Sequence, residues 1–585
     1  MTPEPQDIAP LTAVADKSSE TTETTETTET TETVEKNPTD RPRILVADPI
    51  AREGMELLYT FAAVDARQGL TSDELIATIP DYDALIVRSE TRVTPEVIAA
   101  GGRLKVIARA GVGVDNIAVE AATRRGVIVV NSPTGNIAAA AEHTVALLFA
   151  LARHIPGATA SLREGRWERS RFVGAEIRGK TLGIIGLGKV GAEVARRAGE
   201  GGLGMRLLAT DPYASPETAR TLNVEMVALE DLLAQSDFVT IHTALTGGTR
   251  GLIGADELAL MKPTARIINC ARGGIVHEEA LLAALEADAL AGAALDVYSK
   301  EPPGDNTTIL ALIAHPHVIA TPHLGASTEE AQISVAVDVV EQVEEILRGG
   351  AARAAVNAPM ILPEAMRQLQ PWVALVEKLG RLYTQLHPGP LRRAELSVSG
   401  EIASYDTRPL SAALVKGLLE SISEAHVNLV NAPVVARDWG LELVESRSTA
   451  QEQYANLITI RVLADGPETP ASILSATITW GTERVVRVDR YATDFVPQGH
   501  ILFARNLDRP GMVGRVGTIL GEAGVNISHM DVGPVASATS GRGRQNGQAG
   551  GEALMILSLD GPVPDDALER IHEADGIFGI TSVVL

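Results

Sequence analysis

The chain has 585 residues, and about 150 residues per domain suggests roughly four domains. An apolar content of 45% is enough for several buried cores and excludes a disordered or fibrous protein. The 75 acidic and 51 basic residues give a net charge of −24, which argues against nucleic acid or an anionic membrane as the main partner. No long apolar run predicts a membrane span, and the single cysteine fits a reducing, cytoplasmic compartment.

Residues 1–40 form an acidic tail that belongs to no predicted core. Residues 21–32 are four copies of Thr-Thr-Glu, and the tail holds ten acidic and two basic side chains. Such a polar segment cannot offset the entropy lost on ordering, so we expect it to be disordered. Its composition matches neither a signal peptide nor a transit peptide. A solubilising tail and a specific docking tail are both compatible with this pattern.

Short apolar runs alternate with helical stretches from Arg43 onwards. An Ala-rich helix is predicted at 137–154, and a second strand-helix series runs from Lys180 to about Ala320. Ser327 is predicted to open a capping box for a further helix. Strands alternating with helices predict parallel sheets that are covered on both faces. The strands predicted in the first series lie at 43–47, 84–87, 104–107 and 126–130.

The second half of the chain has a different organisation. A proline-bearing stretch at 358–363 predicts a linker, and residues 364–499 predict another α/β region. Residues 500–585 follow the order strand, helix, strand, strand, helix, strand, which is the ferredoxin-like βαββαβ arrangement. Residues 537–551 are rich in Gly, Ser, Gln and Arg and predict a flexible insertion between its second and third strands.

A predicted strand at 181–185 runs directly into Gly186-Leu-Gly188-Lys-Val-Gly191, and a helix follows. Gly186 permits a tight turn, Gly188 lets the backbone approach a pyrophosphate, and Gly191 lets the helix pack on the strand. A second strand ends at Asp211, where an acid binds the ribose hydroxyls of NAD and repels the 2′-phosphate of NADP. The strand, glycines, helix and acid together predict an NAD site rather than a structural glycine turn.

Reactive side chains follow three strands of the second series: Arg272, Glu301 and His323. Ligands bind beyond the carboxyl ends of strands in open α/β sheets, so we expect these groups to converge beside the nicotinamide. A histidine, whose ordinary pKa lies near neutrality, can exchange the hydroxyl proton of an alcohol. Glu301 would hold His323 in one tautomer, and Arg272 would bind a carboxylate through two parallel hydrogen bonds.

Each of these side chains alone has an ordinary explanation, such as a helix cap for a histidine after proline. Behind a dinucleotide fold, the three together predict hydride transfer. Cys270 fits packing better than reactivity, and His315 with His317 is too small a group for a metal site. The chain has no CxxC or HExxH motif, so we expect no metal.

Several segments carry a family resemblance. They resemble the NAD-dependent D-2-hydroxyacid dehydrogenases, and among these the family of long-form D-3-phosphoglycerate dehydrogenases. The resemblance covers about Arg43 to Leu585, which is all of the chain except the tail. The segments that carry it lie at 87–91, 108–116, 186–191, 269–274, 294–297 with 301–302, 322–328 and 427–432.

The resemblance implies two Rossmann-like, doubly wound parallel-sheet domains, an α/β intervening domain of the allosteric substrate-binding type, and a C-terminal ferredoxin-like ACT domain. The substrate-binding domain would be discontinuous, because its last helix follows the nucleotide domain. The implied boundaries are 41–138 with 326–357 for the substrate domain, 139–325 for the NAD-binding domain, 364–499 for the intervening domain and 500–585 for the ACT domain. A homo-oligomer, a dimer or a tetramer, is also implied.

The resemblance further assigns roles to individual residues, with Arg272, Glu301 and His323 as the catalytic set. NAD would contact residues at strand ends and at the glycine turn, namely Gly186, Gly188, Lys189, Val190, Gly191, Asp211, Thr243, Cys270, Ala271, Asp296, Leu324, Gly325 and Ala326. The substrate would contact the first domain at Arg88, Ser89, Arg109, Gly111, Val112, Gly113 and Asn136. L-serine would bind the ACT domain at Asn506, Asp508 and Asn526, although a purely structural dimerisation module is the alternative there.

The implied activity is the NAD-dependent oxidation of 3-phospho-D-glycerate to 3-phosphohydroxypyruvate, at the start of L-serine synthesis. A phosphate and a carboxylate need two cationic poles, which Arg272 on one side and Arg88 with Arg109 on the other would supply. These arginines could equally be surface charges. The alternatives are a dehydrogenase of another 2-hydroxy acid, such as 2-hydroxyglutarate, and a nucleotide-sensing interaction protein that resembles transcriptional corepressors.

Overall fold

The computed structural model describes residues 41–350, 352–359, 363–420, 427–450, 453–464, 471–535 and 551–585. The predicted acidic tail lies outside the described residues, as does the predicted insertion apart from Gly551. Within the described part, no single helix is long and apolar enough to cross a membrane. One bent pair of helices, Ile137–Ala152 with Ile155–Arg163, meets the length and composition criteria only when the two are taken together.

The first sheet has five parallel strands in the order β2-β1-β3-β4-β5. Its strand β2 was not predicted from the sequence, because it lies at the edge of the sheet and its side chains are partly or fully exposed. An edge strand of this kind lacks the apolar run by which the four inner strands are recognised. The strands are β1 (Arg43–Val46), β2 (Ala63–Ala66), β3 (Ala84–Val87), β4 (Val106–Arg109) and β5 (Ile128–Asn131).

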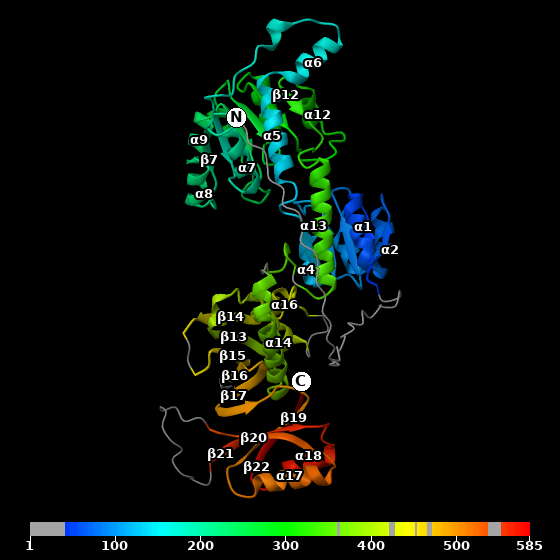
Figure 1. Ribbon diagram of the computed structural model, residues 1–585, viewed down its shortest axis with the longest axis vertical. Helices are drawn as coiled ribbons and strands as arrows, with labels where there is room; N and C mark the ends of the chain where they lie inside the picture. The colour runs from blue at the N-terminus through cyan, green and yellow to red at the C-terminus, as the bar shows by residue number, and fades with distance from the viewer. Residues whose placement is uncertain are drawn as a thin grey trace, which may run out of the picture. The chain divides into compact units, whose positions relative to one another are not determined.

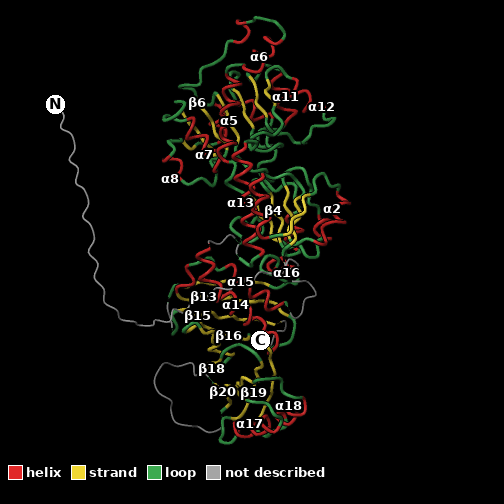
Figure 2. The backbone as a smooth tube through the Cα atoms, turned by 45° about the vertical axis from the view of Figure 1, so that its right-hand side comes forward, coloured by secondary structure: helices red, strands yellow, loops and turns green. Residues whose placement is uncertain are grey.

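Helices cover both faces of this sheet (Figure 2). One face packs on helices α2, α3 and α4, and the other packs on α1 and on α13, which returns from much later in the chain. Figure 1 shows α13 running along the sheet beside α1. These helices are α1 (Arg52–Phe61), α2 (Ser72–Thr78), α3 (Pro95–Ala100), α4 (Val119–Arg124) and α13 (Glu329–Leu347).

The start of α13 differs from the prediction by one residue. Thr328, not Ser327, is the N-cap, and its Oγ1 accepts a hydrogen bond from the backbone N–H of Ala331 at 3.2 Å. Both residue types cap helices well, so only the backbone conformation decides between them.

The second sheet has seven parallel strands in the order β12-β11-β10-β9-β6-β7-β8. Strand order reverses between β6 and β9, which creates the crevice where doubly wound sheets bind ligands. The predicted doubly wound fold class is therefore confirmed for both parallel sheets. The strands are β6 (Thr181–Ile185), β7 (Arg206–Thr210), β8 (Glu225–Met226), β9 (Phe238–Ile241), β10 (Arg266–Asn269), β11 (Gly292–Leu295) and β12 (Val318–Ala320).

Two buried clusters, one on each face, anchor the helices of this second sheet. Helix α5 ends at Ala152, two residues before the predicted end at His154. His154 has a left-handed backbone with φ of 53° and starts a second helix, α6. The helices are α5 (Ile137–Ala152), α6 (Ile155–Arg163), α7 (Lys189–Ala198), α8 (Pro216–Thr221), α9 (Leu229–Gln235), α10 (Ala255–Leu260), α11 (Glu278–Glu286) and α12 (Thr307–Ala314).

The third sheet is mixed, with β13 and β14 parallel and its other neighbours antiparallel, in the order β14-β13-β15-β16-β17-β18. Its helices are α14 (Pro363–Leu386), α15 (Arg408–Leu419) and α16 (Ala432–Asp438). Its strands are β13 (Leu391–Gly400), β14 (Glu442–Ser448), β15 (Asn456–Ala464), β16 (Ser472–Thr479), β17 (Thr482–Val488) and β18 (Tyr491–Phe495).

The fourth sheet is antiparallel with the order β20-β21-β19-β22, and the predicted βαββαβ arrangement is confirmed. One face of the sheet packs on its own helices. The other face contributes Ile501, Phe503 and Leu554 to the core of the third sheet, so the two units share apolar contacts. The elements are β19 (His500–Leu507), α17 (Met512–Glu522), β20 (Ile527–Pro534), β21 (Glu552–Leu559), α18 (Asp565–His572) and β22 (Ile577–Val584).

Candidate active site

Two of the three glycines in the turn after β6 cannot be replaced by a residue with a side chain without a steric clash. Gly186 has a φ of +93°, and a Cβ there would lie 2.7 Å from the carbonyl oxygen of His242. A Cβ on Gly191 would lie 2.1 Å from the carbonyl oxygen of Gly186, so the helix could not approach the strand. By contrast, a Cβ on Gly188 meets nothing within 4 Å, which leaves an open side above the helix N-terminus.

The carboxylate of Asp211 fastens this turn to the end of β7. Its Oδ2 accepts from the backbone N–H of Leu187 at 2.8 Å, and its Oδ1 accepts from that of Tyr213 at 2.8 Å. The acid therefore lies beside the glycine turn, where the ribose of a dinucleotide is expected. Its charge and position both suit NAD.

Other predicted cofactor residues border the same crevice, and two observations test whether they fit a dinucleotide. The Oγ1 of Thr243 is buried and finds no hydrogen-bond partner among the described residues, as expected of a group that awaits a polar ligand. The second observation is the open space at Gly188. Lys189 and Val190 begin α7, and Cys270 with Ala271 follows β10. Burial raises the pKa of the Cys270 thiol to about 12, which supports its packing role.

Asp296 organises the loop that carries His323. Its carboxylate is fully buried and accepts from Thr321 Oγ1 at 2.7 Å and from the backbone N–H groups of Leu324 and Gly325 at 2.7 and 2.8 Å. Burial opposes ionisation, but hydrogen bonds from His143 and Thr321 outweigh it, and the pKa of Asp296 is lowered. The backbone N–H of His323 donates to the Asp296 carbonyl oxygen at 2.9 Å, so one residue fixes the whole turn.

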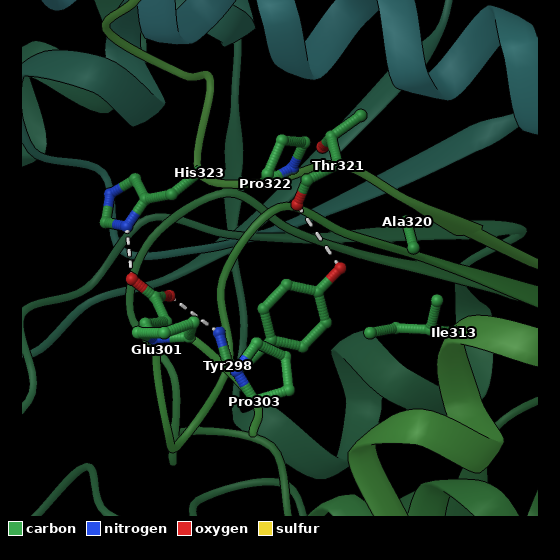
Figure 3. A pocket seen from close by; sticks show the side chains of 9 residues that line it. Tyr298, Glu301, Pro303, Ile313, Ala320, Thr321, Pro322 and His323 are labelled. Carbon is green, nitrogen blue, oxygen red and sulfur yellow. Dashed lines mark hydrogen bonds and ion pairs between the residues drawn. The ribbon is translucent and has the colours of Figure 1, made fainter. Parts of the chain in front are cut away.

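His323 and Glu301 form a close pair (Figure 3). The Nδ1 atom of His323 lies 2.7 Å from Oε2 of Glu301, and the other carboxylate oxygen accepts from the backbone N–H of Tyr298 at 2.8 Å. The pairing places the proton on Nδ1 and leaves Nε2 free to accept a proton from a substrate. The largely apolar cavity that this pair borders has a volume of about 400 Å³.

The Arg272 side chain leaves the end of β10 and reaches the first domain. Its Nη1 donates to the carbonyl oxygen of Ala271 at 2.7 Å, and its Nε lies 3.3 Å from Oδ2 of Asp115. Asn269 supports the turn, because its Nδ2 donates to the Arg272 carbonyl oxygen at 3.0 Å. The predicted guanidinium is thus placed between the two parallel-sheet domains.

Arg88 and Arg109 of the first domain lie close enough to Arg272 for their charges to interact. The pKa of Arg109 is lowered to about 10, first by burial and then by the positive charges of Arg272 and Arg88. The structure therefore brings three of the predicted substrate and catalytic cations together. Ser89 is exposed beside Arg88, and Asn136 immediately precedes α5. Gly111, Val112 and Gly113 form the loop that follows β4.

Two supporting residues of this site were missed in the sequence. The buried carboxylate of Asp48 accepts from the backbone N–H groups of Arg88 and Thr91 and from the Thr91 hydroxyl. Asn116 donates to the carbonyl oxygens of Arg88 and Thr91 and accepts from Nε of Arg109 at 3.3 Å. An acid two residues beyond the end of the buried strand β1 was the available indication for Asp48.

The three predicted effector residues do not share a hydrogen bond in the described part of the chain. Asn506 is buried, and its Oδ1 finds no partner there, whereas its Nδ2 donates to the carbonyl oxygen of Leu507. The Nδ2 of Asn526 instead donates to Asp560 at 2.7 Å, and Asp508 is exposed.

The family model "D-isomer specific 2-hydroxyacid dehydrogenase, NAD binding domain" matches residues 145–325. The fold and this match define an NAD-dependent oxidoreductase of the D-2-hydroxyacid dehydrogenase class. A lactate dehydrogenase structure from Aquifex aeolicus shares the fold, with a TM-score of 0.50 and 24% identity over 54% of this chain and 99% of that one.

Two further family models match later parts of the chain, the D-3-phosphoglycerate dehydrogenase intervening domain at 368–489 and the ACT domain at 500–576. A D-3-phosphoglycerate dehydrogenase from Synechocystis is 44% identical over 93% of this chain and 95% of its own length. One from Methanocaldococcus jannaschii is 43% identical over 93% of this chain and all of its own. The chain belongs to the D-3-phosphoglycerate dehydrogenase family, which confirms the resemblance stated from its motifs.

Proposed function

We propose that this protein oxidises 3-phospho-D-glycerate to 3-phosphohydroxypyruvate with NAD, as the first step of L-serine biosynthesis. The convergence of Arg272 with Arg109 and Arg88 carries the proposal, because it sets cationic groups from both parallel-sheet domains around one loop. In that loop Asn116 hydrogen-bonds Arg109 and the Arg88 backbone, and the adjacent Asp115 pairs with Arg272. The names of the relatives, which match over 93% of this chain, support the same substrate.

His323 performs the proton transfer in this proposal. Its Nε2 accepts the proton of the substrate hydroxyl, and Glu301 on Nδ1 stabilises the imidazolium that results. The glycine turn, the N-terminus of α7 and Asp211 would hold NAD, which would accept the hydride. The Asp296 network keeps the His323 turn in place during the reaction.

The two ends of the substrate are bound by different domains. Arg272 binds the carboxylate, which is adjacent to the reacting carbon, and Arg88 with Arg109 binds the phosphate. With a pKa of about 10, Arg109 stays charged at neutral pH despite its burial. Its low exposure strengthens the attraction for a dianion, because charges in a low-dielectric environment are poorly screened.

The test is a substrate panel followed by NADH absorbance at 340 nm. We expect kcat/KM for 3-phospho-D-glycerate to exceed that for D-glycerate by about 100-fold or more, because the latter leaves a charged hydrogen-bonding site unpaired. His323→Ala should lower turnover by about 10²–10⁴-fold and leave NAD binding unchanged. Unchanged turnover in this variant would remove His323 from the mechanism.

The same panel distinguishes the alternatives. A higher kcat/KM for D-2-hydroxyglutarate than for 3-phospho-D-glycerate would assign the enzyme to another 2-hydroxy acid. NAD binding without turnover of any member would favour a nucleotide-sensing protein. The intact pair of His323 and Glu301 argues against the latter, because sensing requires no proton transfer.

We also propose that L-serine binds the ACT domain and inhibits the enzyme, with Asn506 as the anchor. The Oδ1 of Asn506 is buried and has no hydrogen-bond partner among the described residues, which favours this role, since a serine ammonium or hydroxyl would satisfy it. Removal of residues 500–585 should abolish serine inhibition and preserve turnover, because the proposed catalytic groups all precede Gly350. Serine inhibition that persists in the truncated enzyme would transfer the effector site to the intervening domain.

The proposed enzyme is a homo-oligomer. Around α6 the chain exposes Leu162, Trp167 and Val173, with Trp167 79% exposed, and such a group of apolar side chains indicates a protein contact. Sedimentation of the wild type and of Trp167→Ser tests this point. A wild-type monomer would contradict it.

A further inference from the structure

The guanidinium that we assign to the substrate carboxylate already has a carboxylate partner within the chain. Nε of Arg272 lies 3.3 Å from Oδ2 of Asp115, which belongs to the loop after β4 in the other parallel-sheet domain. The Arg272 side chain is 29% exposed and that of Asp115 is 68% exposed. The acid is therefore the more solvent-exposed partner of the pair.

The backbone leaves room for this pair. A Cβ on Gly113 would lie 2.3 Å from Nη2 of Arg272 and 2.9 Å from Oδ2 of Asp115. Any larger residue at this position would collide with both partners. The glycine thus allows the arginine of one domain to approach the loop of the other closely.

Two acids, Asp115 and Asp48, act on the group of three arginines formed by Arg88, Arg109 and Arg272. The positive charges of Arg272 and Arg88 act on Arg109 in one direction, and the negative charges of Asp115 and Asp48 act in the other. Asp48 is buried, and its oxygens are occupied by hydrogen bonds from Arg88 and Thr91. Of these two acids, only Asp115 is exposed enough to exchange its partner for a ligand.

We propose that Asp115 is a built-in counter-anion that occupies Arg272 in the free enzyme and is replaced there by the carboxylate of the substrate. The proposal rests on the proposed function, and it makes Asp115 a determinant of anion affinity and selectivity. In the free enzyme Asp115 limits repulsion among the arginines and competes with small anions from solution. In the complex it gives up Arg272 to a ligand with two anionic ends.

The exposure of the pair makes this exchange feasible. Ion pairs open to solvent stabilise a protein only weakly, so a substrate anchored at its phosphate end can displace one. Removing the Asp115 charge should therefore improve anion binding modestly, by about two- to five-fold. Both loss of the competitor and loss of repulsion toward an anionic substrate act in this direction.

The test compares Asp115→Asn with the wild-type, full-length enzyme. We expect KM for 3-phospho-D-glycerate to fall about two- to five-fold, with kcat changed less than two-fold. Inorganic sulfate should inhibit Asp115→Asn at a correspondingly lower concentration. The conservative variant Asp115→Glu should keep the KM and the sulfate inhibition of the wild type. Asp438→Asn is the matched control, because Asp438 is also exposed and pairs with an arginine, Arg124, outside the site.

A KM that rises in Asp115→Asn would show that the acid positions Arg272 for the substrate, and an unchanged KM with unchanged sulfate inhibition would show that the pair has no role; either result overturns the proposal. Binding of sulfate to wild type and variant, measured by calorimetry, gives a readout that does not depend on turnover. If the wild type fails to oxidise 3-phospho-D-glycerate, the proposed function fails, whereas the sulfate comparison still decides the role of Asp115.

Discussion

The substitution Asp296→Asn should separate the positioning of His323 from NAD binding and from general stability. The Asp296 carboxylate accepts from Thr321 Oγ1 and from the N–H groups of Leu324 and Gly325. An asparagine keeps one acceptor oxygen and replaces the other with a donor. With Oδ1 retained toward Thr321 and Leu324, the new NH₂ would face the N–H of Gly325 at the former 2.8 Å contact.

The expected cost follows from that mismatch. The buried Gly325 N–H loses its acceptor and the new NH₂ finds none, and each unsatisfied group costs about 1–3 kcal/mol, so we expect a loss of about 2–6 kcal/mol. In a domain of about 150–250 residues that loss lowers the midpoint of thermal unfolding by about 4–24 °C. Because the displaced Gly325 belongs to the turn of His323, kcat should fall at least about ten-fold.

Thermal unfolding of the nucleotide-binding domain is followed by calorimetry, and turnover is followed by the absorbance of NADH at 340 nm. The control is Asp237→Asn, in the same sheet but at the opposite end of the strands, where the carboxylate accepts from the Thr181 N–H and from Lys262. It should lower stability and leave kcat unchanged. A fully active Asp296→Asn enzyme would refute the idea that this network positions His323.

Three further results are expected. Asp211→Ala should weaken the binding of NAD more than the binding of NADP, because the variant loses an acceptor for the ribose hydroxyls and a charge that repels the 2′-phosphate. The preference for NAD over NADP should therefore become smaller. Equal use of both cofactors by the wild type would contradict this role of Asp211. Gly191→Ala should lower thermal stability, since its Cβ would collide with a backbone oxygen. Gly188→Ala should leave thermal stability unchanged and weaken the binding of NAD. Burial lowers the pKa of His242 to about 4, so its neutral form stabilises the fold above the ordinary histidine pKa of about 6.5, and this contribution is lost as pH falls from there toward 4. Because the residue keeps some solvent contact, we expect at most about 2 kcal/mol, and His242→Gln should flatten the stability profile in this range.

Much of the site could be predicted because its chemistry is local in sequence. The glycine turn, its strand and Asp211 form one continuous unit, and steric limits at Gly186 and Gly191 leave few other sequences for it. The strand-end positions of Glu301 and His323 were likewise visible, and the structure places the two side chains 2.7 Å apart.

Other features have no local indication. The edge strand β2 lacks a buried apolar run, because all four of its side chains are partly or fully exposed. The choice of Thr328 over Ser327 as N-cap depends on how α13 meets the first sheet, far away in sequence. Asn526 is an effector candidate by its motif, yet in the structure its side-chain amide donates a hydrogen bond to Asp560.

The sequence by itself determined the fold class, the dinucleotide turn and the identity of the reactive groups, because hydrophobic periodicity and glycine sterics act over a few neighbouring residues. Only the tertiary structure showed that an acid, Asp115, joins the predicted arginines. Asp115 and Arg272 are 157 positions apart, and their pairing exists because two sheets direct their strand ends toward one another. Long-range electrostatics of this kind depends on distances that chain order does not encode.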